Sequence, residues 1–197
     1  MTTTLISAIT TATAEQADQA AAVIALAFTS DPVVRWTYPD PGEYLRHWPV
    51  VVKAFGGNAF AHGTAHIAPE FAGAALWLSP GVHPDEDALD AALQATVAPE
   101  RVSAIFEMFE QMASYHPAGP HWYLPLVGVD PAQQGKGHGA ALLRHALETA
   151  DRDRLPAYLE STNPRNLSLY RRHGFELVGT IGVGTAPPLF PMVRPAR

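Results

Sequence analysis

The sequence predicts an α/β (α+β) fold, and two observations lead to this prediction. Short apolar runs typical of strands alternate with longer segments that have the apolar spacing of helices, and no repeat or low-complexity linker interrupts them. In addition, the apolar strand Trp122–Val129 leads through a glycine-rich segment into an Ala/Leu-rich helix. The 197 residues suit one domain of ordinary size, so we expect a single domain over residues 1–197.

Apolar periodicity and the positions of Gly and Pro locate the elements of the N-terminal half. Thr13-Ala14-Glu15-Gln16 has the pattern of a helix N-cap, and Thr29-Ser30-Asp31-Pro32 breaks the helix that follows. In chain order we expect a strand over Leu5–Thr11, a helix over Ala17–Phe28, a helical region over 33–54 interrupted near Pro39–Gly42, a turn at Gly56–Asn58, and strands over His62–Ile67 and Gly73–Leu78.

The C-terminal half contains two helix starts that carry Pro and acidic residues, at Pro84-Asp85-Glu86-Asp87 and at Pro99-Glu100. In chain order we expect helices over 84–96 and 99–114, a loop over Tyr115–Pro120, a strand over Trp122–Val129, a helix over Gly137–Ala150, a strand over Ala157–Ser161, a short helix over Asn163–His173, and strands over Phe175–Val183 and Leu189–Val193.

Composition narrows the class of partner. At 47% hydrophobic and 16% charged residues the chain is typical of a globular protein. The net charge is −6 and the only lysines are Lys53 and Lys136, which argues against nucleic acid or an anionic membrane as a partner. An acidic protein suits a cationic acceptor such as an amine, although the same charge also serves solubility alone.

The chain contains no cysteine, which excludes disulfides, thiolate metal sites and an acyl-cysteine intermediate. His116 and His121 have no partners at the spacing of a zinc site, so we expect no metal. Threonines rather than a basic region follow Met1, and the longest apolar stretch, Ala20–Phe28, is too short to span a bilayer. We therefore expect a cytoplasmic protein; whether it is a monomer or a homodimer stays open.

The glycine-rich segment after Val129 predicts a phosphate-binding loop. It exposes backbone N–H groups at the start of a helix, where the helix dipole favours an anion. A Walker A loop is disfavoured because Asp130 and Gly137 stand where that pattern requires a glycine and a hydroxyl. A dinucleotide fingerprint fits better, since Glu160 follows at a suitable distance, but Gly135 lies far from the strand and too little chain remains after Glu160.

A third interpretation rests on resemblance. The run Gln134-Gly135-Lys136-Gly137-His138-Gly139 resembles the coenzyme A loop of the GCN5-related N-acetyltransferases (GNAT), in which Gln or Arg is followed by two residues, Gly, one residue, and Gly or Ala. The block from Leu159 to Phe175 is similar to the segment of that superfamily in which an Asn contacts the cofactor and a Tyr faces the thioester sulfur. Together the two blocks cover roughly the last 75 residues.

The resemblance implies a mixed, mostly antiparallel twisted sheet of six to seven strands, helices on both faces, splayed central strands, and acetyl-CoA as cofactor. Within the superfamily, segments such as Pro156-Ala157-Tyr158-Leu159-Glu160 and Met192-Val193-Arg194 look most like puromycin N-acetyltransferase-like enzymes. The first 70 residues show no comparable match, and because that region usually shapes the acceptor pocket, puromycin itself is not implied.

The resemblance also implies which residues bind the cofactor. The backbone of the loop from Gln134 to Ala140 would hold the pyrophosphate, and Lys136 either adds charge or is an ordinary solvated lysine. His138 departs from the apolar residue common at its position, but its N–H remains. Asn163 and Asn166 would contact the cofactor. The full cofactor set is Val127, Val129, Gln134, Gly135, Lys136, Gly137, His138, Gly139, Ala140, Asn163 and Asn166.

Gly128 in mid-strand indicates a bulge or a close backbone approach, and a splay there would free backbone groups of Val127 and Val129 for the pantetheine arm. Tyr170 is the candidate general acid, because a phenol stays protonated at neutral pH and can donate to a thiolate. The alternative is a core tyrosine that packs beside Phe175. Glu160 is the first candidate base.

Other base candidates are weaker. Glu107 and Glu110 are expected on a solvent-exposed face of the helix before the central strand. His121, just before the central strand, is another candidate base. The sequence therefore predicts an acetyl-CoA-dependent N-acetyltransferase that transfers acetyl to a primary amine of a small molecule by direct transfer in a ternary complex. The alternative is a non-catalytic acyl-CoA-binding regulatory module, which would need no acid. The acceptor and the length of the acyl chain stay open.

Overall fold

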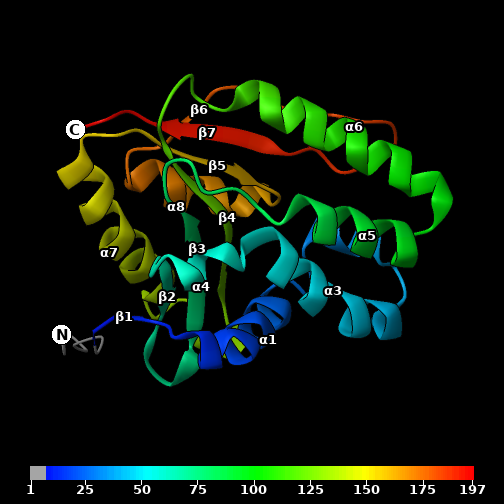
Figure 1. Ribbon diagram of the computed structural model, residues 1–197, viewed down its shortest axis with the longest axis horizontal. Coiled ribbons are helices and arrows are strands. Elements are labelled where there is room, and N and C mark those ends of the chain that lie inside the picture. Colours follow the sequence, from blue (N-terminus) through cyan, green and yellow to red (C-terminus); the bar gives the residue numbers. More distant parts are fainter. Residues whose placement is uncertain (1–7) are drawn as a thin grey trace.

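Strands from both halves of the chain form one mixed sheet in the computed structural model, which describes residues 8–197 (Figure 1). The strand order is β1-β2-β3-β4-β5-β7-β6, and every neighbouring pair is antiparallel except β4 and β5. The strands are β1 Thr10–Thr11, β2 Ala65–Ile67, β3 Gly73–Leu78, β4 Trp122–Val129, β5 Ala157–Ser161, β6 Glu176–Leu177 and β7 Phe190–Arg194. The predicted mixed, mostly antiparallel sheet is confirmed.

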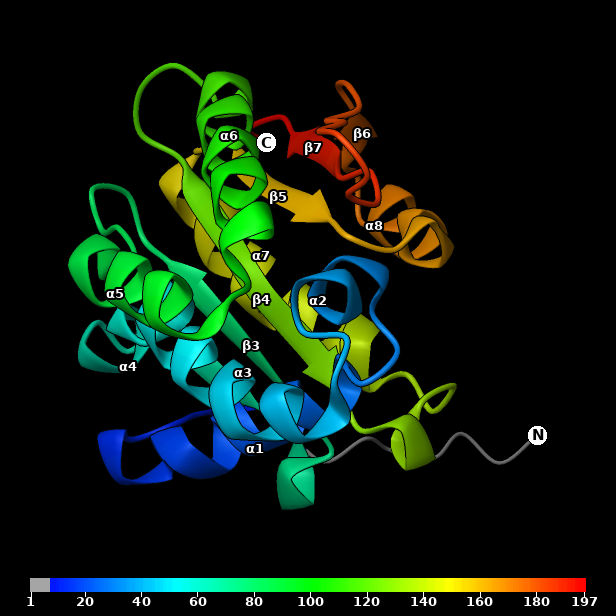
Figure 2. The ribbon, with the colours of Figure 1, turned by 90° about the vertical axis from the view of Figure 1, so that its right-hand side faces the viewer.

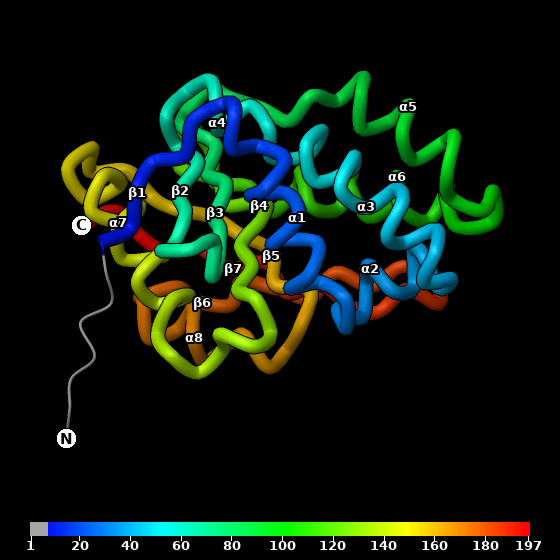
Figure 3. Tube along the Cα trace, turned by 90° about the horizontal axis from the view of Figure 1, so that it is seen from below, coloured from blue at the N-terminus to red at the C-terminus, as the bar shows by residue number. Residues whose placement is uncertain are grey.

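Helices cover both faces of this sheet. They are α1 Ala17–Ala27, α2 Pro32–Thr37, α3 Pro41–Gly56, α4 Asn58–Ala61, α5 Glu86–Thr96, α6 Pro99–Tyr115, α7 His138–Asp153 and α8 Leu167–Arg172. Figure 3 shows α7 on one side of the strands and α3, α5 and α6 on the other. Among the helices of residues 8–197, none combines the length and the apolar character that crossing a membrane requires.

Three predicted strands match the structure residue for residue: β3, β4 and β5. The other elements differ in part. Of the strand predicted over Leu5–Thr11, the residues up to Ser7 lie outside the described part of the chain, and β1 covers only Thr10–Thr11. The turn predicted at Gly56–Asn58 is confined to Gly57, because Gly56 ends α3 and Asn58 begins α4. Gly57 has helical angles (φ −65°, ψ −26°) and its N–H donates to the Lys53 carbonyl, so the chain passes from α3 almost directly into α4.

Two predicted strands are shorter than expected. His62 closes α4, so β2 begins only at Ala65. The strand predicted over Phe175–Val183 is reduced to β6 and one isolated bridge between Ile181 and Leu189. Gly179 lies between these pieces, where a Cβ would stand 2.4 Å from the Tyr115 ring. The chain bends around that ring instead of continuing the strand.

The two central strands pair over a short stretch only. The parallel register between β4 and β5 joins Trp122 to Ala157 and Tyr123 to Tyr158, and beyond these pairs the strands diverge (Figure 2). The β3–β4 register shifts between Leu76 and Leu78, so that β4 carries one residue more than β3 at this point. Pro125 lies in this bulge, and it has no N–H to donate to a neighbouring strand. The predicted splay is confirmed.

Each face of the sheet has its own apolar core. On one face, α7 buries Leu142, Leu143 and Leu147 against Trp77 and Leu159. On the other, the N-terminal helices and α6 pack around Tyr123, Leu126 and Tyr158. Side chains of β4 and β5 alternate between the two cores, as expected for strands covered on both faces. The divergent ends of β4 and β5 therefore remain fixed by packing even though they do not pair with each other.

Gly128 lies where α1 crosses β4. A Cβ on this residue would stand 2.7 Å from the Cβ of Ala27 and 3.2 Å from the Cα of Ile24. The glycine therefore marks a close approach between a helix and a strand, which is one of the two readings that its position in mid-strand allowed. Because the bulge is at Pro125, Gly128 itself does not cause the splay.

We expect Gly128→Ala to destabilise the fold by about 1–3 kcal/mol, since the added methyl group overpacks a contact that includes the backbone of α1. Thermal unfolding followed by circular dichroism measures the effect. Gly182→Ala is the matched control, because a Cβ there meets no atom within 4 Å. Equal melting temperatures for the two variants would contradict the tight packing of α1 on β4.

Candidate active site

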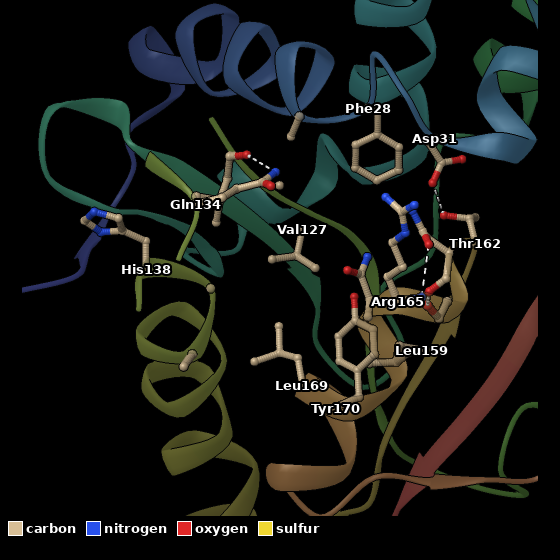
Figure 4. Close-up of a pocket in the computed structure, with 18 of the residues that line it drawn as sticks. Phe28, Asp31, Val127, Gln134, His138, Leu159, Thr162, Arg165, Leu169 and Tyr170 are labelled. Carbon is tan, nitrogen blue, oxygen red and sulfur yellow. Dashed lines mark hydrogen bonds between the residues drawn. The ribbon is translucent and has the colours of Figure 1, made fainter. Parts of the chain in front are cut away.

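The divergence of β4 and β5 opens a pocket of about 560 Å³ between them. Its walls come from β4, β5, the start of α7, the helix α8 and the turn between α1 and α2. Figure 4 shows side chains from these elements that point into it, with Phe28 and Asp31 on one side and Leu169 and Tyr170 on the other. Every predicted site residue except Lys136 lines this pocket.

Val127 and Val129 turn their backbone polar groups toward the open side of β4. The Asp130 N–H donates to the Ala72 carbonyl at 2.9 Å, so Asp130 faces β3. In an antiparallel pair, alternate residues point their N–H and C=O groups to opposite sides. Val127 and Val129 therefore face away from β3, toward the gap that β5 has left. The N–H groups of both valines and the Val127 carbonyl are free to pair with an extended ligand that enters between the strands, whereas the Val129 carbonyl accepts the Gln134 side chain.

The loop after β4 presents several N–H groups to the pocket. Gly137 is the N-cap of α7 with φ of 91°, and Gly135 has φ of 75°. The first bond of the helix runs from the Ala141 N–H to the Gly137 carbonyl. The N–H groups of His138, Gly139 and Ala140 consequently have no partner within the helix. A helix of 16 residues adds the positive end of its dipole at this point, so the loop fits a pyrophosphate.

Polar side chains hold the loop in shape. The Gln134 amide donates to the Val129 carbonyl at 3.2 Å, and the Lys136 ammonium donates to the Gln133 side chain at 2.8 Å. Lys136 thus lies on the loop outside the residues that line the pocket. The Nδ1 of His138 is buried and has no hydrogen-bond partner among the described residues. The N–H of His138 remains one of the free donors at the start of α7.

Asn163 has the capping role expected from its position before Pro164. Its Oδ1 accepts the Arg165 N–H at 3.0 Å and begins the short turn that leads into α8. Asn163 and Asn166 both line the pocket. Their contacts with a cofactor stay a prediction.

Tyr170 lies on α8, between the core and the pocket. Its ring packs edge-on against Phe175 with centroids 6.1 Å apart, as the alternative interpretation expected. Its hydroxyl nonetheless points into the pocket (Figure 4), and within residues 8–197 it makes no hydrogen bond. Burial, and secondly the nearby Asp31 carboxylate, raise the pKa of this phenol. Tyr170 is therefore held protonated, with its proton directed into the space between the strands.

Glu160 lies on β5 at the edge of the pocket, and its side chain is only 4% exposed. The Tyr123 hydroxyl donates to its Oε2 at 2.9 Å, while Oε1 is buried without a hydrogen-bond partner. Glu107 and Glu110 are instead exposed on α6, as the solvated-face interpretation expected. Of the carboxylates named from the sequence, Glu160 alone reaches the pocket.

Comparison with known proteins agrees with this geometry. A family model described as the acetyltransferase (GNAT) family matches residues 103–175. An uncharacterised N-acetyltransferase of Schizosaccharomyces pombe is 28% identical over 172 residues, which cover 80% of this chain and 69% of that protein. A Corynebacterium glutamicum crystal structure described as "histone acetyltransferase HPA2 and related acetyltransferase" superposes with a TM-score of 0.69 at 28% identity, covering 98% of each chain.

The match to the GNAT family covers residues 103–175, and the two relatives with 28% identity over most of the chain are both described as acetyltransferases. The chain is accordingly an acyltransferase, which disfavours the alternative of a non-catalytic binding module. The arylalkylamine N-acetyltransferase 2 of Aedes aegypti shares the fold with a TM-score of 0.65 at 15% identity, covering 96% of this chain and 98% of that chain. The nearer resemblance to puromycin N-acetyltransferase-like enzymes stays a prediction.

The pocket contains three further residues that the sequence did not single out, and the first two, Asp31 and Thr162, bond to each other. Asp31 begins α2: its Oδ1 accepts the N–H groups of Val33 and Val34 at 3.0 and 3.1 Å, and its Oδ2 accepts the Thr162 hydroxyl. This last bond joins the α1–α2 turn to the loop after β5 across the pocket (Figure 4). Burial raises the pKa of Asp31. The Asp-Pro pair signalled only a helix boundary, and nothing in the sequence indicates its distant partner.

Arg165 is the third of these further pocket residues. It follows Asn163 in the turn before α8, and it lines the pocket (Figure 4). Its guanidinium adds positive charge to the pocket, on the side of Phe28 and Asp31 (Figure 4). A signal is present in the sequence, because Arg165 stands in the segment that resembles the cofactor-binding block.

We expect Gly137→Val to weaken coenzyme A binding severely, since a branched side chain at φ of 91° strains the N-cap of α7 and moves the N–H groups of the loop. Isothermal calorimetry with coenzyme A measures the affinity. The matched control is Gly81→Val, which brings the same strain at φ of 82° but lies outside the residues that line the pocket, and a Cβ there meets no atom within 4 Å. Unchanged affinity in Gly137→Val would remove the loop from the cofactor site.

Proposed function

We propose that this enzyme is an acetyl-CoA-dependent N-acetyltransferase that acetylates a primary amine of a small molecule by direct transfer in a ternary complex. The observation that carries the proposal is the cleft itself. A loop suited to pyrophosphate, a strand with free backbone groups and the protonated Tyr170 line one continuous pocket in that order. This order follows the phosphate, pantetheine and thioester parts of acetyl-CoA.

Bound acetyl-CoA would supply an acetyl thioester at the end of the pocket near Tyr170 and Glu160. The pantetheine arm would pair with the backbone of β4 as an added strand does. The same pairing would orient the carbonyl of the thioester. Tyr170 would donate its phenolic proton to the departing sulfur. Because burial keeps that phenol protonated at neutral pH, the proton is available at every turnover.

Two buried carboxylates favour an amine as the acceptor. Glu160 and Asp31 both line the pocket near its reacting end, and both are largely withdrawn from solvent. A protonated amine is attracted to such a place, since the attraction between opposite charges is much stronger away from bulk water. Glu160 would then remove the proton that the amine must lose before it attacks. Oε1 of Glu160 has no hydrogen-bond partner among the described residues, so this carboxylate has unused capacity to accept a proton.

A thiol-release assay against a panel of amines, antibiotics and peptides tests the function as a whole. The acceptor that supports turnover identifies the substrate class, and mass spectrometry of the product locates the acetyl group on nitrogen or oxygen. Failure of every amine, together with a measurable affinity for coenzyme A, would favour a different acceptor group over a different cofactor.

Removing the Tyr170 hydroxyl is expected to lower kcat by about 10²–10⁴-fold, the usual contribution of a general acid. Tyr170→Phe keeps the ring and its contact with Phe175, so the affinity for acetyl-CoA should barely change. Steady-state kinetics and calorimetry on the same variant separate these quantities. Tyr38→Phe is the control, because it removes a hydroxyl from another buried tyrosine, one that bonds to Thr96 outside the cleft. Full turnover in Tyr170→Phe would refute the acid role.

Initial-velocity measurements are expected to give intersecting double-reciprocal lines, since both substrates must be bound before transfer. The chain has no cysteine, and the Ser161 hydroxyl at the end of β5 is buried and donates to the Asn163 carbonyl at 2.9 Å. A cysteine nucleophile is thus excluded, and the Ser161 hydroxyl is already engaged. Parallel lines, or acetylated protein recovered without acceptor, would contradict direct transfer and point to Ser161.

A further inference from the structure

A continuous polar cluster extends from the reacting end of the pocket toward the loop before β4. Its members are Tyr123, Glu160, His116 and His121, called here the His–Glu cluster. Tyr123 donates to Oε2 of Glu160, and Oε1 of the same carboxylate lies 3.6 Å from Nε2 of His116. The Nδ1 of His116 in turn lies 2.9 Å from Nε2 of His121. The sequence had named Glu160 and His121 as separate base candidates, and the fold connects them through His116.

The hydrogen bonds of the cluster fix where its protons lie. Nδ1 of His121 is 2.8 Å from the Gly119 carbonyl, which can only accept, so this nitrogen carries the proton. In a neutral ring, Nε2 of His121 is then an acceptor, and Nδ1 of His116 must donate to it. Nε2 of a neutral His116 is left with a lone pair. It faces the Oε1 atom of Glu160, which also has no proton when the carboxylate is ionised.

Two acceptors therefore face each other at the centre of the cluster. Oε1 of Glu160 is buried and unpaired, and within residues 8–197 no lysine or arginine forms an ion pair with this carboxylate. An unsatisfied buried acceptor costs free energy, which one added proton shared between Oε1 and Nε2 would relieve. The cluster is thus built to receive one proton at Glu160.

Aromatic packing fixes the His–Glu cluster, and the cluster extends from the buried Glu160 toward solvent. The His116 ring lies against Tyr158 and Tyr123, with centroids 4.3 and 4.7 Å apart. The exposed fraction of the side chain rises from 4% at Glu160 to 27% at His116. Metal binding does not explain the arrangement, because among the described residues no group of three or more His, Cys, Asp or Glu is placed to hold an ion.

We propose that His116 and His121 form a relay that carries the proton removed by Glu160 from the acceptor amine to solvent. The proposal rests on the proposed function. The acceptor enters as R–NH₃⁺ and gives one proton to Glu160; the new C–N bond forms as the C–S bond breaks. The thiolate takes the proton of Tyr170, and the second proton of the nitrogen replaces it on Tyr170, so the one proton held by Glu160 is released for each amide formed.

Each transfer in the relay uses a contact of the structure. Glu160 passes its proton to Nε2 of His116, whose Nδ1 proton moves to Nε2 of His121, and the Nδ1 proton of His121 leaves to water. Exchange with water restores the starting tautomers. Burial lowers the pKa of His121, opposed by its bond to Gly119, which keeps that ring a neutral acceptor. The titratable groups facing the cluster are Tyr115, Tyr123, Tyr158, His83, His116, His121 and Glu160.

The kinetic test uses His116→Gln and His121→Ala on the full chain with an amine that the wild type acetylates. We expect each variant to lower kcat by about 10²-fold, the low end of what a proton-transfer group contributes, with the KM for acetyl-CoA unchanged. Added imidazole should restore much of the activity of His121→Ala by replacing the missing ring. His83→Gln is the control, since His83 lies near His121 outside the chain of hydrogen bonds.

The second readout needs no turnover. Nitrogen-15 NMR of the unliganded protein should show the proton on Nδ1 of both His116 and His121, and in His121→Ala the neutral His116 should lose this tautomer preference. If the wild type is active and kcat in both variants stays within twofold of the wild-type value, the relay is overturned but the proposed function is not. Protons on Nε2 of the two histidines in the wild type would have the same consequence. No turnover of any amine by the wild type would overturn the proposed function and the relay with it.

Discussion

The short pairing between β4 and β5 is the constraint on which the site depends. These strands are hydrogen-bonded neighbours at Trp122–Ala157 and Tyr123–Tyr158 only, and the bulge at Pro125 coincides with the end of their contact. A continuous sheet would satisfy the backbone of Val127 and Val129 internally and leave no pocket. The two apolar cores compensate for the missing ladder, because side chains on both faces hold the diverging strands apart.

The position of Tyr170 follows from the same divergence. The chain leaves β5 at Ser161, turns at Asn163 and enters α8, which places the tyrosine at the open side of β5. The bond between Asp31 and Thr162 ties this turn to the N-terminal helices, so elements 131 residues apart enclose one site. Asp31 thereby does two things: it begins α2, and it places a buried negative charge near the phenol of Tyr170.

Prediction from the sequence succeeded where the signal is local. The strands β3, β4 and β5 are short apolar runs bounded by Gly, Pro or polar residues, and the glycines before α7 predict where that helix begins. It failed where tertiary contact decides. Gly57 has helical backbone angles, which a glycine in a Gly-Gly-Asn run does not predict. The chain bends at Gly179 around the Tyr115 ring. The Asp31–Thr162 and Tyr123–Glu160 bonds join distant residues that no periodicity connects.

The use of main-chain groups on the open side of β4 has a consequence for how this enzyme can diversify. The side chains of Val127 and Val129 pack toward the α7 core, whereas the atoms that face the cleft belong to the backbone. Substitutions that keep the strand intact leave those atoms in place whatever side chain they bring. The turn between α1 and α2 lines the other side of the pocket with side chains such as Phe28 and Asp31. Under the proposed function, substitutions in this turn can therefore change the preference for the acceptor while the backbone that would bind the donor stays the same.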